Sequence, residues 1–241
     1  MQTSACWHDI VPSTPMNYPC RIADDVVALG RWWGVLVYLV LGAKPMLVDA
    51  GPSGHARKII EAVRSVGIYP STITGIVLTH FDYDHSGSAQ QLSVELNAPV
   101  SIHKADASLL MQPQKCPGLR RFLYHPPIPR LLRWQPIQAD IELSSGDTLG
   151  DWKVLHTPGH TPGSISLVRD TVGLVGDALV YRNRQLRPNV WHLSTNHAQE
   201  LASAKLLANS GLQIVLPGHY APSTRPNAVM KLASRLACES S

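Results

Sequence analysis

Four side chains that can bind a metal ion lie within six residues, in the sequence HFDYDH that begins at His80. His80, Asp82 and Asp84 alternate, and alternate residues of an extended chain point to the same side. A turn at Asp84 and His85 can then direct the fourth side chain inward. A bound cation stabilises carboxylates and imidazoles packed this closely, because it favours their deprotonated forms. The segment therefore predicts a metal site; a solvated turn that caps a helix is the alternative.

Three later segments share one design, in which an apolar strand ends and a glycine turn follows. His160 lies between two Pro-Gly turns in residues 157–163, Asp177 follows the apolar pair 174–175, and His219 follows the apolar run 214–216. A single histidine at a strand end is more often an ordinary hydrogen-bonded loop residue. Two histidines and one aspartate in equivalent places favour a shared metal site instead.

Composition limits the class of protein. A chain of 241 residues, 44% hydrophobic, is long enough for one large domain or two fused halves, and we expect a single domain over residues 1–241. The apolar run 35–41 is too short to span a bilayer, and the first residues lack the pattern of a signal peptide. The four cysteines have no CxxC spacing, which argues against a thiolate zinc site and favours free thiols in a reducing cytoplasm. A net charge of +4 does not by itself indicate nucleic acid as a partner.

The order of predicted elements indicates an α/β protein with two similar halves. The first half has strand-like runs at 26–29, 35–41, 46–48, 76–78 and 99–102, with helices over 53–66 and 89–96. The second has runs at 141–143, 152–155, 165–168, 174–175 and 214–216, with an irregular stretch over 181–194. Asn196 and Gln199 predict the cap of a helix that ends at Ala208 and turns Leu201, Leu206 and Leu207 inward; a closing helix begins at Pro226.

Residues 104–139 differ from the rest of the chain, with six prolines, four arginines and three aromatic residues. We interpret them as a lid-like insertion over the site, partly helical around 119–124. A solvated basic loop is the alternative. If the segment is exposed, its aromatic residues are equally suited to a homodimer contact.

As a set, Asp49, HFDYDH, HTPGHTPGS, GDA and PGH resemble the metallo-β-lactamase fold superfamily, in the order expected for it and over most of the chain. The resemblance implies a four-layer αββα sandwich with a dinuclear metal site at one edge of its two sheets. It implies one metal held by His80, residue 82 and His160, a second held by Asp84, His85 and His219, and Asp177 and a hydroxide bridging them. It also implies that Asp49 orients ligand histidines; capping the helix near residue 53 is the alternative role.

One position departs from that family. Its usual motif is HxHxDH, and this chain has Asp82 in place of the second histidine. A carboxylate can bind zinc, manganese or iron, so two divalent ions remain the expected cofactors, with zinc as the first choice. Asp82 would make the first site more anionic, which retains the metal but lowers its Lewis acidity. The other outcome is that Asp82 turns away and leaves a weaker first site.

The resemblance implies hydrolysis by a metal-bridging hydroxide, with Asp84 passing a proton to the leaving group. The HTPGHTPGS segment is most similar to the lactonase and glyoxalase-II-like branch, including acyl-homoserine lactonases. The expected substrate is therefore a small molecule with a lactone, ester or thioester carbonyl. Tyr181, four residues after Asp177, is a candidate contact for that carbonyl and otherwise a packing residue.

Three alternatives remain open. A phosphodiesterase or nuclease of the same fold would use arginines of the 104–139 segment for phosphate, namely Arg120, Arg121, Arg130 and Arg133. A β-lactamase is the second alternative, although such enzymes are usually exported. The third is an iron redox enzyme or a binding protein without catalysis, which the Asp82 change favours and the other ligands oppose.

Overall fold

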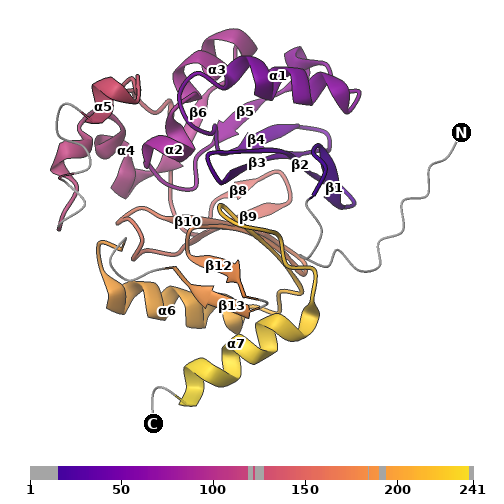
Figure 1. Ribbon diagram of the computed structural model, residues 1–241, viewed down its shortest axis with the longest axis vertical. Helices are drawn as coiled ribbons and strands as arrows, with labels where there is room; N and C mark the ends of the chain where they lie inside the picture. The colour runs from indigo at the N-terminus through magenta and orange to yellow at the C-terminus, as the bar shows by residue number, and fades with distance from the viewer. Residues whose placement is uncertain (1–15, 119–121, 123–127, 184, 190–193, 239–241) are drawn as a thin grey trace, which may run out of the picture.

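The computed structural model describes residues 16–118, 122, 128–183, 185–189 and 194–238. These residues form two large β-sheets that pack face to face, with helices over both outer faces (Figure 1). Helices α1 and α3 lie beyond the first sheet, and α6 and α7 lie beyond the second. The predicted four-layer αββα arrangement is therefore confirmed.

The first sheet, as far as the chain is described, has seven strands in sequence order. They are β1 (Cys20–Ala23), β2 (Val26–Trp32), β3 (Val35–Val40), β4 (Met46–Val48), β5 (Gly75–Val77), β6 (Val100–His103) and β7 (Ile141–Leu143). Pairing is antiparallel from β1 to β4 and parallel from β4 to β7. The carboxyl ends of β4, β5 and β6 therefore share one edge, and the HFDYDH loop follows β5 there.

The second sheet has the order β14-β11-β10-β9-β8 among the described residues. Its strands are β8 (Thr148–Leu149), β9 (Trp152–His156), β10 (Ile165–Arg169), β11 (Val172–Gly176) and β14 (Ile214–Pro217), and a separate hairpin joins β12 (Leu179–Arg182) to β13 (Gln185–Pro188). Because β11 and β14 run parallel, Asp177 and His219 emerge at the same end of this sheet.

The helices are α1 (Ala56–Ser65), α2 (Tyr83–Ser86), α3 (Ala89–Leu96), α4 (Lys104–Met111), α5 (Ile128–Leu131), α6 (His197–Ala208) and α7 (Pro226–Cys238), with short 3₁₀ turns at Pro70–Thr72 and Pro113–Lys115. In the described part of the chain, no helix is long and apolar enough to cross a membrane.

The continuous apolar run of β3 reflects burial of both of its faces. Val37 and Leu39 belong to the core under α1 and α3, while Leu36, Tyr38 and Val40 belong to the core between the sheets. Successive residues of a strand point to opposite faces, so a strand covered on both sides has no polar face. This packing holds the two sheets together and fixes the edge at which the predicted ligands meet.

Two predictions for the second half are wrong. Residues 181–194 were expected to be irregular, but β12 and β13 occupy much of that stretch, with buried Leu186 between exposed Gln185 and Arg187. Leu206 was expected to face inward, yet it is 47% exposed. The buried face of α6 follows Glu200, Ser203, Ala204 and Leu207, three or four residues apart, and Leu206 lies off that stripe.

The remaining helix predictions fit more closely. Asn196 accepts a hydrogen bond from the backbone N–H of Gln199 and caps α6, and α7 begins at Pro226, both as predicted. The first helix begins at Ala56, three residues later than expected. The helix expected around 119–124 lies outside the described residues, except for exposed Phe122.

Candidate metal centre

The HFDYDH loop leaves the end of β5 and turns into the short helix α2. Backbone N–H groups of His85 and Ser86 donate to the carbonyl of Asp82, at 2.9 and 2.8 Å, and close that turn. The hydroxyl of Ser86 donates to the carbonyl of Phe81 at 2.8 Å. The predicted turn at Asp84 and His85 is thus a helical one, and it directs His85 into the interior, where it is 0% exposed.

One group of donors combines His80, Asp82 and His160, all buried, with ligand atoms within 4.8 Å of one another. Asp82 Oδ2 lies 3.4 Å from His80 Nε2 and 3.2 Å from His160 Nε2. The structure therefore turns the unusual Asp82 toward the two histidines, not away from them. We call these residues the first donor group.

A second donor group combines Asp84, His85 and His219, again within 4.8 Å. His219 Nε2 lies 3.3 Å from Asp84 Oδ2 and 3.3 Å from His85 Nε2. His85 is fully buried, whereas the side chains of Asp84 and His219 are 26% and 24% exposed. This group is the one that faces solvent.

Asp177 lies between the two groups. Its Oδ2 is 3.4 Å from His160 Nε2 of the first group and 3.4 Å from His219 Nε2 of the second, and its Oδ1 is 3.5 Å from His85 Nε2. The strand end that carries it thus places one carboxylate beside histidines of both groups, which is the arrangement expected of a bridging ligand.

Buried hydrogen bonds orient the histidine rings. Asp49 Oδ2 lies 2.8 Å from His85 Nδ1, and the hydroxyl of Thr79 lies 3.0 Å from His80 Nδ1. Asp49 also accepts from the backbone N–H of Thr79 at 2.8 Å. The N-cap of α1 is His55, so Asp49 does not have the alternative capping role. Partners on Nδ1 leave each Nε2 directed toward the other donors.

Charge and burial shift the pKa values of these groups in opposite directions. Burial, together with nearby His85, lowers the pKa of His80 to about 4. Burial would also lower the pKa of His85, but the carboxylates of Asp49, Asp177 and Asp84 raise it to about 10. Burial acts to raise the pKa of Asp177, yet the histidines around it hold that pKa far below the usual range.

The donor set fits divalent metal ions. His80 Nε2 and Asp177 Oδ1 are buried and have no hydrogen-bond partner among the described residues, and buried polar atoms are rarely left without one. Gly218 keeps the centre tight, since a Cβ there would lie 2.5 Å from His85 Cε1 and 2.6 Å from Asp177 Oδ1. Mixed imidazole and carboxylate donors suit zinc, iron or manganese.

The sequence analysis missed Asp106 and Asn189. Asp106 on α4 is fully buried and contacts the backbone of both ligand-bearing loops, and Asn189 Nδ2 donates to Asp177 Oδ2 at 3.1 Å. Burial raises the pKa of Asp106 to about 6, against the opposing effect of the hydrogen bond from Thr161. Neither residue belongs to a local motif, and only the position of Asp106 just after an apolar strand offered a signal.

Tyr181 lies on β12 and is 3% exposed, within the apolar core formed with α6 and α7. Its hydroxyl has no hydrogen-bond partner in the described part of the chain. Tyr181 is thus close to Asp177 in sequence, but its side chain is packed inside the core.

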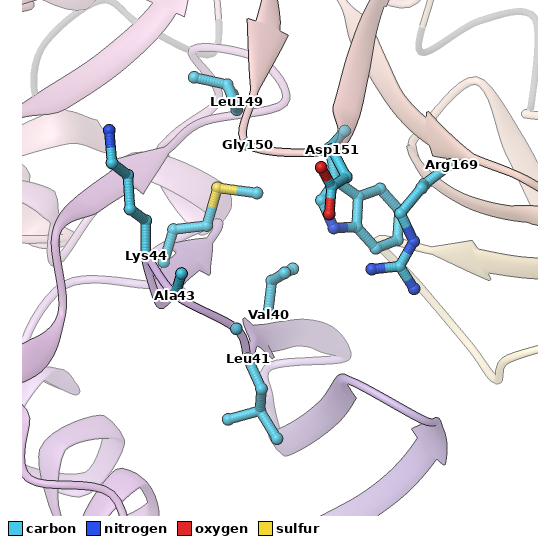
Figure 2. Close-up of a pocket in the computed structure, with 11 residues that line it drawn as sticks. Val40, Leu41, Ala43, Lys44, Leu149, Gly150, Asp151 and Arg169 are labelled. Carbon is cyan, nitrogen blue, oxygen red and sulfur yellow. The ribbon is translucent and has the colours of Figure 1, made fainter.

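A pocket of about 240 Å³ lies elsewhere, and its lining contains none of the predicted ligands. Figure 2 shows Lys44 and Arg169 on opposite sides of it, with Asp151 near Arg169. The guanidinium of Arg169 is already held by the carboxylate of Asp25. This pocket is therefore separate from the metal centre.

Several proteins of known sequence are similar to this chain. An uncharacterized protein of Aquifex aeolicus is 32% identical over 224 residues, which cover 89% of this chain and 90% of that protein. The uncharacterized protein YobT of Bacillus subtilis is 31% identical over 208 residues, 78% of this chain and 85% of its own length. A hydroxyacylglutathione hydrolase of Alkalilimnicola ehrlichii is 28% identical over 155 residues, 64% of this chain and 51% of that protein.

Solved structures agree on the fold. The class B3 di-zinc metallo-beta-lactamase LRA-12 from an Alaskan soil metagenome superposes with a TM-score of 0.70 at 18% identity, covering 96% of both chains. The subclass B3 metallo-beta-lactamase BJP-1 of Bradyrhizobium japonicum gives 0.68 at 21% identity, over 91% of this chain and 90% of its own. Residues 30–219 match the family model described as the metallo-beta-lactamase superfamily. Fold, donor groups and sequence thus agree, and the chain belongs to the metallo-beta-lactamase superfamily of metal-dependent hydrolases.

Proposed function

We propose that the protein hydrolyses a lactone, ester or thioester with two divalent metal ions, zinc as the first choice. His80, Asp82 and His160 would hold one ion, Asp84, His85 and His219 the other, and Asp177 both. The observation that carries the proposal is the position of Asp177, within 3.5 Å of histidine nitrogens from both donor groups.

When bound, such ions lower the pKa of water enough to supply a nucleophile at neutral pH and polarise a carbonyl. The protein supplies proton transfer and orientation. Asp84 is the partly exposed carboxylate of the centre, and His85 and His219 lower its pKa to about 2 against the opposing effect of burial. It is therefore ionised at neutral pH and can accept a proton and pass it to the leaving group.

Side chains beside His219 favour a substrate with both an apolar and an anionic part. Trp33 is 60% exposed at the turn between β2 and β3, and Tyr220 is 43% exposed. Gly34, next to Trp33, approaches the His219 ring, and Arg182 lies over the ring of Tyr220 with its Cζ 5.9 Å from the centroid. An acyl ester or thioester that carries a carboxylate matches this combination. A thioester is also the bond that the name of the Alkalilimnicola ehrlichii relative indicates.

The lid role of residues 104–139 remains part of the proposal. The segment connects β6 to the parallel strand β7, and its first part is helix α4. Trp134 Nε1 donates to the hydroxyl of Ser86 on α2 at 3.1 Å, so the segment touches the metal-binding loop. Arg120, Arg121 and Tyr124 lie outside the described residues, and no phosphate-binding role is assigned to them.

For Tyr181 to contact substrate, its hydroxyl would have to become reachable, since the side chain is 3% exposed. We therefore expect Tyr181→Phe to leave kcat/KM within a few-fold of the parent, as the packing role requires. We also propose a cytoplasmic location, because Cys20 and Cys116 are free thiols.

The test combines metal analysis of the purified protein with a substrate panel of lactones, acyl thioesters, carboxylic esters, phosphodiesters and β-lactams. We expect about two metal ions per chain and highest kcat/KM on a lactone or thioester. Asp84→Asn should lower that kcat/KM by about 10²–10⁴-fold. Asp151→Ala, which removes an exposed carboxylate away from the centre, is the matched control. Turnover of phosphodiesters or β-lactams without lactone, ester or thioester turnover would refute the proposal.

A further inference from the structure

Asp106 is a buried carboxylate with no role in the proposed chemistry. It lies in the first turn of α4 and is 0% exposed. It accepts three hydrogen bonds, from Thr161 Oγ1 at 2.6 Å, from the backbone N–H of Gly163 at 2.6 Å and from the backbone N–H of Phe81 at 3.2 Å. These partners are all uncharged. A buried carboxylate without a cationic partner is costly, so its retention calls for an explanation.

The three donors come from two loops that are far apart in sequence. Phe81 stands between His80 and Asp82, and Thr161 follows His160 directly. Asp106 therefore joins the loop after β5, in the first sheet, to the turn after β9, in the second. Those two loops carry the entire first donor group.

The contact on the His160 side is tight. A Cβ on Gly163 would lie 2.6 Å from the Asp106 carboxylate, so only glycine allows this approach. Ser164 Oγ accepts from the backbone N–H of Thr161 at 3.0 Å and lies 2.8 Å from its hydroxyl, which holds Thr161 in place. The carboxylate thus meets a turn whose own geometry is already fixed.

Asp106 lies next to the first donor group, since it accepts hydrogen bonds from Phe81, between His80 and Asp82, and from Thr161, beside His160. A buried anion that is not neutralised by a neighbouring side chain favours a cation at adjacent donors, because charges are screened weakly in the interior. The hydrogen bonds of Asp106 and its negative charge therefore both favour binding of a metal ion at the first donor group.

We propose that Asp106 is a positioning residue that fixes the His160 turn against the His80–Asp82 loop and thereby retains the first metal ion. The inference rests on the metal centre of the proposed function but not on its substrate.

Asp106→Asn tests it with little change of shape. An amide has one acceptor oxygen, so the variant cannot accept both from Gly163 and from Phe81, and it carries no charge. Thr161→Val keeps the carboxylate and removes the hydroxyl that donates to Asp106, together with its contact to Ser164 Oγ. Asp140→Asn is the matched control, since Asp140 also accepts a backbone N–H bond, from Val100, at the opposite end of β6.

The measurement is metal affinity, by competition against a chromophoric chelator, with the absorption spectrum of the cobalt-substituted protein to identify the site. His160→Ala and His219→Ala provide the reference spectra for loss of the first and second site. We expect Asp106→Asn to weaken the first site by about 10–100-fold and leave the second within about threefold. Thr161→Val should weaken the first site less, and Asp140→Asn should affect neither.

Equal weakening of both sites, or unchanged affinity in Asp106→Asn, would overturn the inference. If circular dichroism shows that Asp106→Asn does not fold, Thr161→Val tests the inference instead. A weaker first site with an unchanged second site supports it, and any other result overturns it. A parent protein that binds no metal would refute the proposed function itself, whereas two ions bound with the same affinities by the parent and by Asp106→Asn would refute only the role of Asp106.

Discussion

The two donor groups use the same residue types in different surroundings. His80, Asp82 and His160 of the first group are buried, between 1% and 6% exposed. The second group pairs fully buried His85 with Asp84 and His219, whose side chains are about one quarter exposed. The loops of the first group are joined by Asp106. Those of the second are held by Asp49 and by Tyr38, whose hydroxyl donates to the carbonyl of Pro217 at 2.8 Å.

The surroundings shift the pKa values of two buried histidines in opposite directions. His80 has a pKa lowered to about 4 by burial and by His85, so it is neutral at pH 7 and ready to bind a metal. His85 is equally buried, but three carboxylates raise its pKa to about 10. It must release a proton before it can bind metal. Neighbouring charge, and not burial, therefore distinguishes these two histidines.

The largest effect should come from removing the residue that the two groups share. We expect Asp177→Ala to lower metal occupancy at both sites and kcat/KM by about 10²–10³-fold or more, because it removes the charge between them. Metal analysis and the best substrate of the panel provide the measurements, with Asp151→Ala as control. Loss of metal from one group alone would show that Asp177 belongs to that group and does not bridge.

The metal affinities of the two donor groups should depend differently on pH. Below pH 10, metal binding at the second group displaces the proton of His85, and the carboxylates of Asp177 and Asp84 also raise the pKa of His219 against the effect of burial. The metal affinity of this group should therefore rise by about tenfold or more per pH unit between pH 6 and 9. His80, with its low pKa, adds no such dependence above about pH 5. Chelator competition at several pH values measures both affinities. A first site as steep as the second would contradict the assignment of pKa values.

Replacing Asp82 tests the departure from the family motif. Asp82→His removes a negative charge from the first donor group, so we expect its preference for zinc over manganese to increase about tenfold, since imidazole favours zinc. Metal content after growth and dialysis in mixed metals gives the ratio. An unchanged ratio at the first site would mean that residue 82 does not bind metal there.

The smallest effect should follow from Tyr38→Phe, which acts only on the second group. It leaves the buried carbonyl of Pro217 without this hydrogen bond, and we expect a loss of about 1–2 kcal/mol in the free energy of unfolding. Urea denaturation of the metal-free protein measures the loss. A variant as stable as the parent would contradict the role given to Tyr38.

Much of this architecture could be predicted because its signals are local. The alternation of His80, Asp82 and Asp84 and the glycine turns at His160, Asp177 and His219 are visible within a few residues. The cap of α6 and the start of α7 were equally local and correct. The hairpin β12–β13 was missed because β13 has only one apolar residue that is buried, Leu186, and ends in a proline.

The sequence by itself determined which residue types stand at the strand ends and so which side chains are able to bind metal. Only the tertiary structure decided which of them meet. It placed Asp177 beside both groups, turned Asp82 toward the histidines, and let Asp106 join the loop of Phe81 to the turn of Thr161, which lies 55 residues after Asp106. The physical reason is that ligand type is a property of one residue, whereas proton affinity and metal geometry depend on neighbours brought together by the packing of two sheets.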